Sequence, residues 1–268
     1  MRNSSLALVG FLACVAAAAA QQAQQAQPPA TQPALSAAER AKLVDTHLQA
    51  WEVRMKEISS LQMDGIERTD KDNQLKYVSK WRGTAKYSKP NMASLVLQRD
   101  DKPELFEKWV CTGAAIYQFA PANKEIIIHQ LPAKKDGNLS DENFLGFMFG
   151  MKAEDAKKRY GLQVTAGKEK DPYYVYIDIQ PREDRDKADF EVARLVLHKD
   201  SYLPRQLWFR HPNGDETTWN IPQAKSGVQV DRREFQAPEP PKGWKMVQGL
   251  KPTDASQKAP RIVRPQQP

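Results

Sequence analysis

The sequence predicts an α+β fold: a half-open, strongly curved antiparallel β-sheet or barrel, with an N-terminal amphipathic helix and a mid-chain helical lid. Three observations support this fold class. Residues 75–87 alternate between two kinds of side chain, which is typical of a strand with one covered face. A helical stripe of apolar residues precedes this strand. Short turns separate the strands that follow, as in an antiparallel meander.

The first twenty residues have the pattern of a secretory signal peptide. Arg2 is followed by an apolar run over residues 6–20, which ends in small residues before Gln21. We therefore predict a periplasmic or secreted protein whose mature chain begins near Gln21. The alternative is lipidation at Cys14, because residues 11–14 loosely match a bacterial lipoprotein site, and this would anchor the protein in the outer or inner membrane.

The residues that follow predict a linker and then a helix. Residues 21–35 are rich in Gln, Ala and Pro and lack charged and aromatic side chains, so they cannot bury a core. Ser36 and Glu39 have the spacing of a capping box at a helix start. The apolar residues after them fall on one helical face. They are Ala37, Ala41, Val44, Leu48, Trp51, Met55 and Ile58.

Consecutive strands are expected between residues 61 and 131. Turn sequences interrupt this region at 70–73, 89–91, 99–103, 112–113 and 121–124. In the strand over 75–87, the covered face combines aromatic and small side chains, which suits a sheet that curls. Strands are expected again at 162–165, 173–179, 192–197, 203–210 and 216–221.

Helical sequence interrupts the strands over residues 140–151, and a second short helix is expected at 153–160. The stretch 143–151 is the most apolar one after the signal peptide. One interpretation is a helix that plugs one end of the barrel as part of the core. The other is a movable lid, since Gly146 and Gly150 weaken a helix and methionine adapts to irregular ligands. A plug that can be displaced would serve as both.

The charge distribution argues against nucleic-acid binding. The formal net charge is +7, but the segment 21–241 carries only +1 of it. Arg2 carries +1 and residues 242–268 carry the other +5, most of it in a basic, Pro-rich C-terminal tail over residues 248–268. We therefore divide the chain into a signal peptide (1–20), a linker (21–35), a globular domain (36–247) and this tail.

No catalytic or metal-binding pattern is present in the sequence. The four histidines have no metal-ligand spacing with one another or with Cys111, and His47 is expected on the exposed side of the first helix. Cys111 is expected to be a small buried hydrophobe. No nucleophile elbow, phosphate loop or dinucleotide motif occurs. We therefore expect a protein that is not an enzyme and needs no cofactor.

Several segments together resemble the periplasmic outer-membrane lipoprotein carriers, the LolA/LolB-like superfamily. The order and spacing of these segments carry the resemblance, which extends from about Ser36 to Val247. They are residues 83–91, 116–121, 203–205, 213–214, 217–218, 235–238 and 241–243. The resemblance implies a half-open antiparallel barrel whose apolar cavity holds acyl chains of a lipoprotein beneath a helical lid.

The resemblance and the alternation together give a set of expected cavity and lid residues. They are Tyr77, Trp81, Trp109, Tyr117, Phe119, Phe144, Phe147, Met148, Phe149 and Met151. Carriers of this superfamily commonly hold Arg before Pro where this chain has Lys89, so Lys89 is expected to act as a gate that latches the lid less firmly.

The leading functional hypothesis is a monomeric binding protein for the acyl chains of a lipid or lipoprotein in envelope lipoprotein sorting. An envelope membrane protein is a further expected partner. One alternative is a periplasmic sensor that uses the same fold to bind a partner protein. A second is an envelope hydrolase or carbohydrate binder, which would need a polar, acid-lined interior.

Overall fold

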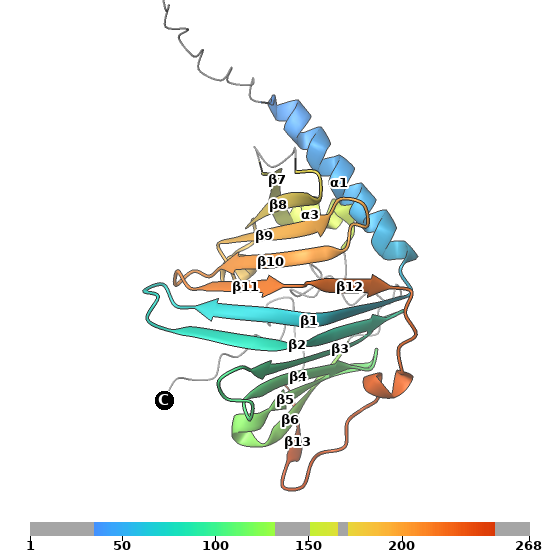
Figure 1. The fold of residues 1–268 in the computed structure, drawn as a ribbon, viewed down its shortest axis with the longest axis vertical. Coiled ribbons are helices and arrows are strands. Elements are labelled where there is room, and N and C mark those ends of the chain that lie inside the picture. The colour runs from blue at the N-terminus through green and yellow to red at the C-terminus, as the bar shows by residue number, and fades with distance from the viewer. Residues whose placement is uncertain (1–34, 132–150, 166–170, 250–268) are drawn as a thin grey trace, which may run out of the picture. The chain divides into compact units, whose positions relative to one another are not determined.

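The computed structural model describes residues 35–131, 151–165 and 171–249. Its fold is α+β, with a large, curved and unclosed antiparallel sheet and two main helices, α1 and α3 (Figure 1). The fold class predicted from the sequence is therefore confirmed. The mid-chain lid predicted over 140–151 lies outside the described residues, except for Met151.

Helix α1 (Ala37–Glu57) begins where the capping box predicts. The Ser36 hydroxyl accepts a hydrogen bond from the Glu39 amide, and the Glu39 carboxylate accepts one from the Ser36 amide. Val44, Leu48, Trp51 and Met55 are buried along one face of the helix, and Ile58 is buried just after it. Ala37 and Ala41, which share this face, are exposed because the first turns extend beyond the core.

The first half of the sheet is the meander that the turn sequences predict. Its strands are β1 (Ser60–Lys71), β2 (Val78–Ser88), β3 (Met92–Arg99), β4 (Phe106–Cys111), β5 (Ala115–Ala120) and β6 (Glu125–Gln130), with the short helix η1 (Pro121–Asn123) before β6. Strand β2 begins at Val78, so the alternation predicted from residue 75 belongs to a strand only from there. Leu75 lies in the preceding turn at φ +56° and is exposed.

The second half contains helix α3 and a second meander. The elements are α3 (Ala153–Arg159), β7 (Tyr160–Val164), β8 (Tyr174–Pro181), α4 (Asp184–Lys187), β9 (Val192–His198), β10 (Pro204–Arg210) and β11 (Glu216–Asn220). Three further elements follow β11 in the described part of the chain, and none of them was predicted. They are β12 (Gln223–Ser226), η2 (Arg232–Phe235) and β13 (Lys245–Gln248).

The strands form one sheet in the order β13-β6-β5-β4-β3-β2-β1-β11-β10-β9-β8-β7, with β12 paired to β1. Every neighbouring pair is antiparallel except β6 and β13, which run parallel. Strands β13 and β7 lie at the two ends of this order, so the sheet curls without closing (Figure 1). Strands β1 and β11 join the two meanders in the middle of the sheet.

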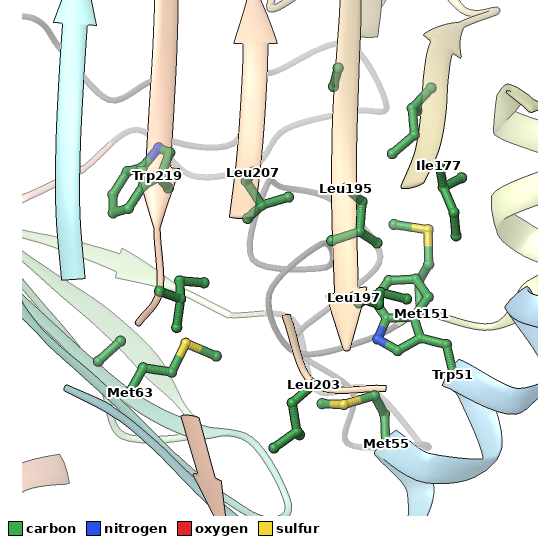
Figure 2. Packing of buried hydrophobic residues seen from close by; sticks show 14 of the residues in the cluster. Trp51, Met55, Met63, Met151, Ile177, Leu195, Leu197, Leu203, Leu207 and Trp219 are labelled. Carbon is green, nitrogen blue, oxygen red and sulfur yellow. The ribbon is translucent and has the colours of Figure 1, made fainter. Parts of the chain in front are cut away.

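Most of the buried apolar residues lie on one side of this sheet, while Val110, Phe119 and Ile126 are buried on the other. Those on the first side form one cluster to which α1 and strands from both meanders contribute (Figure 2). Helix α1 lies against β7 and α3, towards one end of the sheet. At Gly83 in β2, an added Cβ would lie 1.7 Å from the carbonyl oxygen of Val96 in β3, so only glycine allows this close strand pairing.

Candidate functional site

The side of the sheet that carries the buried cluster is called the inner face here, and the opposite side the outer face. The residues of the inner face occur at every second position along each strand, because successive side chains of a strand point to opposite faces of the sheet. Strand β1 contributes Leu61, Met63 and Ile66, and a bulge at Gly65, where φ is +63°, keeps Ile66 in phase with them. On the other meander, Ile177, Leu195 and Leu207 continue the same apolar surface.

Two of the predicted cavity residues lie on the inner face of the first meander. Trp81 is buried there, and Trp109, in register with Leu95, is partly buried and packs against the cluster. Met151 is also buried in the cluster. Tyr77 precedes β2 and is half-buried, with the Arg99 guanidinium 5.4 Å from its ring centroid.

Tyr117 and Phe119 lie on the outer face instead. Phe119 is in register with Lys108, and its ring contacts Phe106 and Trp244 at centroid distances of 6.4 and 5.9 Å. Tyr117 lies on the same side, since it is two residues from Phe119 on the same strand. The structure therefore does not bring these two residues together with Trp81 and Trp109. Phe144, Phe147, Met148 and Phe149 lie outside the described residues.

Lys89, the predicted gate, lies beside the C-terminal end of α1. Its ammonium group donates a hydrogen bond to the main-chain carbonyl of Lys56, in the last turn of that helix. Carbonyls at a helix C-terminus lack partners within the helix and attract a positive charge. The described contact of Lys89 is therefore with α1, and its role as a gate remains a prediction.

A buried charged cluster interrupts the apolar inner face. The Arg68 side chain is 3% exposed and donates two hydrogen bonds of 2.7 Å to the Glu107 carboxylate, with Asp70 at 3.2 Å. The rings of Trp81 and Trp219 flank its guanidinium at 4.6 and 5.2 Å. Burial alone would lower the pKa of Arg68, but the two carboxylates outweigh it and raise the pKa, so the group stays charged.

This cluster was not predicted, although the alternation of side chains along β1 contains a signal for it. Arg68 and Asp70 continue the inner-face series that begins at Leu61, so charged residues occur in phase with buried apolar ones. The carboxylate that pairs with Arg68 could not be predicted, because Glu107 is 39 residues away in sequence and lies on β4.

Metal-ligand groups and the free cysteine can be assessed among the residues that the structure describes. No group of three His, Cys, Asp or Glu side chains in this part of the chain is arranged to hold a metal ion. Cys111 is buried as predicted, and burial raises the pKa of its thiol, which disfavours the reactive thiolate. Within the same residues, no helix has the length and apolar character needed to cross a membrane.

Comparison with known proteins gives likenesses of fold only. No family model matches the sequence, and no curated protein matches it. A conserved uncharacterised protein from Thermus thermophilus is similar with a TM-score of 0.45 and 8% identity, over 78% of this chain and 99% of that chain. The MucA/MucB complex of Pseudomonas aeruginosa gives a TM-score of 0.41 and 13% identity, over 73% of this chain and 61% of that chain.

A LolA superfamily protein from Nitrosomonas europaea gives a TM-score of 0.34 and 10% identity, over 71% of this chain and 97% of that chain. The superfamily that the sequence resembles is thus represented among the solved structures to which this chain is similar. Since these likenesses are distant, the functional argument rests on the residues of the inner face.

Proposed function

We propose that this protein is a non-enzymatic binding protein that holds the acyl chains of a lipid or lipoprotein against the inner face of its sheet. The observation that carries the proposal is the extent of that apolar face. It continues from β3 through β1 and β11 to β8. An α-helix with its side chains is about 10 Å wide, whereas the twelve strands of the main order span about 50 Å. Helix α1 contacts β7 at one end of this face, and the residues along the rest of it are already buried, so a bound acyl chain would take the place of apolar groups that now cover them.

The chemistry of the face suits acyl chains. Burying each CH₂ group contributes about 0.8 kcal/mol, so chains that cannot cross water unshielded gain strongly from such a surface. Met55, Met63 and Met151 belong to the cluster, and their unbranched side chains adapt to ligands of irregular shape. Figure 2 shows them among the branched and aromatic residues of the same cluster.

The cellular setting of the proposal follows from the predicted signal peptide. An exported binding protein of this kind would act in the periplasm or outside the cell, as a monomer that meets an envelope membrane protein. The resemblance to lipoprotein carriers supports envelope lipoprotein sorting as the process. In this proposal the apolar residues 144–151 supply the lid, and Lys89 tunes its closure through α1.

A fluorescence titration tests the proposal. Delipidated mature protein should bind an environment-sensitive fatty-acyl probe, and an unlabelled acylated lipid should displace that probe. Two partly buried tryptophans on opposite faces form a matched pair for this experiment, Trp109 on the inner face and Trp208 on the outer face of β10. Trp109→Ala should weaken probe binding about tenfold, because it removes apolar contact area.

Trp208→Ala should leave probe binding at the wild-type level. The proposal is wrong if the folded protein binds no acyl probe, or if the two substitutions change its affinity equally.

A further inference from the structure

Trp51 carries an unusual feature within the buried cluster. Its side chain is 2% exposed, and its indole N–H has no hydrogen-bond partner in the structure. Leaving a buried donor unpaired destabilises the folded state, because the group gives up its hydrogen bond to water and gains none in return. A phenylalanine would avoid the unpaired donor at the cost of a smaller ring, so the N–H group is the part of Trp51 that apolar packing does not use.

The unpaired groups have one chemical character. Among the described residues, the buried side-chain nitrogen and oxygen atoms without a partner are Trp51 Nε1 and Arg68 Nε, and both are N–H donors. Both donors lie at the buried cluster. Trp51 is a member of it, and Arg68 is flanked by its members Trp81 and Trp219. The buried interior therefore contains two N–H donors without an acceptor. A ligand with hydrogen-bond acceptor atoms would complement them.

Trp51 is the better placed of the two donors. The other nitrogens of Arg68 are bonded to Glu107 and Asp70, and these carboxylates would repel an anionic ligand. Trp51 is on the face of α1 that also buries Leu48 and Met55. In Figure 2 its ring projects from α1 into the part of the cluster drawn with Leu197 and Met151. A buried water needs two to four polar partners, which such apolar neighbours do not supply.

We propose that Trp51 Nε1 donates a hydrogen bond to a carbonyl oxygen of the bound acyl ligand, which makes this protein selective for acyl esters and amides over pure hydrocarbon chains. This inference rests on the proposed acyl-binding function and specifies the ligand class of that same site. An indole N–H donates once and accepts nothing, so it matches a carbonyl oxygen and gives no advantage to an ether-linked chain of equal length. Met55 and Met151 can change rotamer to admit the carbonyl beside the ring.

Ester-linked and ether-linked lipids provide the test, because they carry the same chains with and without carbonyl groups. We expect wild-type protein to bind a diacyl phosphatidylcholine about fivefold more tightly than its dialkyl ether analogue. Trp51→Phe should bring this ratio close to one, mainly by weakening the ester. The same variant should remain folded without ligand, since the packing lost with the smaller ring is partly offset by removal of an unpaired donor.

Trp244→Phe is the matched control, because Trp244 stacks with Phe106 on the outer face, and it should keep the wild-type ratio. An ester-to-ether ratio near one in wild-type protein overturns the inference even if the variant does not fold. An unchanged ratio in folded Trp51→Phe overturns it as well. If neither lipid binds, the proposed function itself fails, which is a different result from binding without selectivity.

Discussion

At the scale of single residues, the inner face combines a buried ion pair with the apolar side chains around it. Arg68 is charged and buried, yet its Glu107 partner is held by two short hydrogen bonds and its planes are covered by two indole rings. Such a pair gains little over an apolar pair of the same volume, because both charges lose their hydration. Its loss is costly, however, because removal of one partner leaves the other charge buried and uncompensated.

Glu107→Gln should therefore destabilise the protein by about 3 kcal/mol, because it leaves the Arg68 charge with Asp70 alone. Denaturant unfolding followed by circular dichroism measures this change. Glu104→Gln is a matched control, since Glu104 is exposed in the connection just before β4, and it should change the free energy of unfolding by less than about 0.5 kcal/mol. Equal effects of the two substitutions would show that the buried pair is not an important structural link.

At the scale of elements, polar contacts attach α1 to the sheet along its length. His47 Nδ1 lies 3.0 Å from the Tyr202 hydroxyl, in the connection between β9 and β10. Arg54 donates to the Ser201 carbonyl and to the Ser226 hydroxyl. His47 was expected on the exposed side of the helix, and this was wrong, because the helical period locates the apolar stripe but does not show which residues pack at its margins.

The His47 contact predicts acid sensitivity of this attachment. Burial and, to a smaller extent, the nearby Lys199 lower the pKa of His47 below its ordinary 6.5. The unfolded state then binds the proton more tightly than the folded state. The stability contributed by neutral His47 is therefore complete above about pH 6.5 and is lost as the pH falls through the lower folded pKa.

His47→Gln should reduce the loss of melting temperature between pH 7.5 and pH 5, measured by calorimetry. Tyr202→Phe removes the hydroxyl but keeps the buried imidazole, so it should retain most of the wild-type acid loss. A His47→Gln profile that parallels the wild-type profile would contradict the assignment.

The elements themselves could be predicted where local pattern determines them. The capping box located the start of α1, and the alternation located the buried positions of β2 from Ser79 to Tyr87. Strands β12 and β13 have four residues each, too few for a period of two to distinguish them from a loop. They exist because they pair with β1 and β6, each more than a hundred residues away in sequence, and a local pattern contains no such information.

At the scale of the whole molecule, the sequence could not determine which face of β5 is the inner one. Both sides of this strand are largely apolar, with Ile116 on one and Phe119 on the other. A period of two separates the two sets but does not say which one meets the cluster. The C-terminal residues decide it, because Phe235 and Trp244 cover the outer face of this region. For this reason Trp81 and Trp109 share the inner face, whereas Tyr117 and Phe119 lie on the outer face.

An unclosed sheet also has edges that must be protected from pairing with other chains. Strand β13 covers β6, whose sequence contains Ile126, Ile127 and Ile128 in succession. An exposed edge with three consecutive isoleucines has the composition of an aggregation-prone strand. The short parallel strand β13 therefore has a protective role that its length would not suggest.

Two truncations of the mature chain test this role. A chain that ends at Trp244 keeps the stack between Trp244 and Phe106 but lacks β13, so the β6 edge is open. It should form dimers or larger assemblies at micromolar concentration, as measured by light scattering. A chain that ends at Gly249 retains β13 and lacks only residues 250–268, and we expect it to remain a monomer. If the shorter chain is folded by circular dichroism and stays monomeric at the same concentration, β13 is not what protects this edge of the sheet.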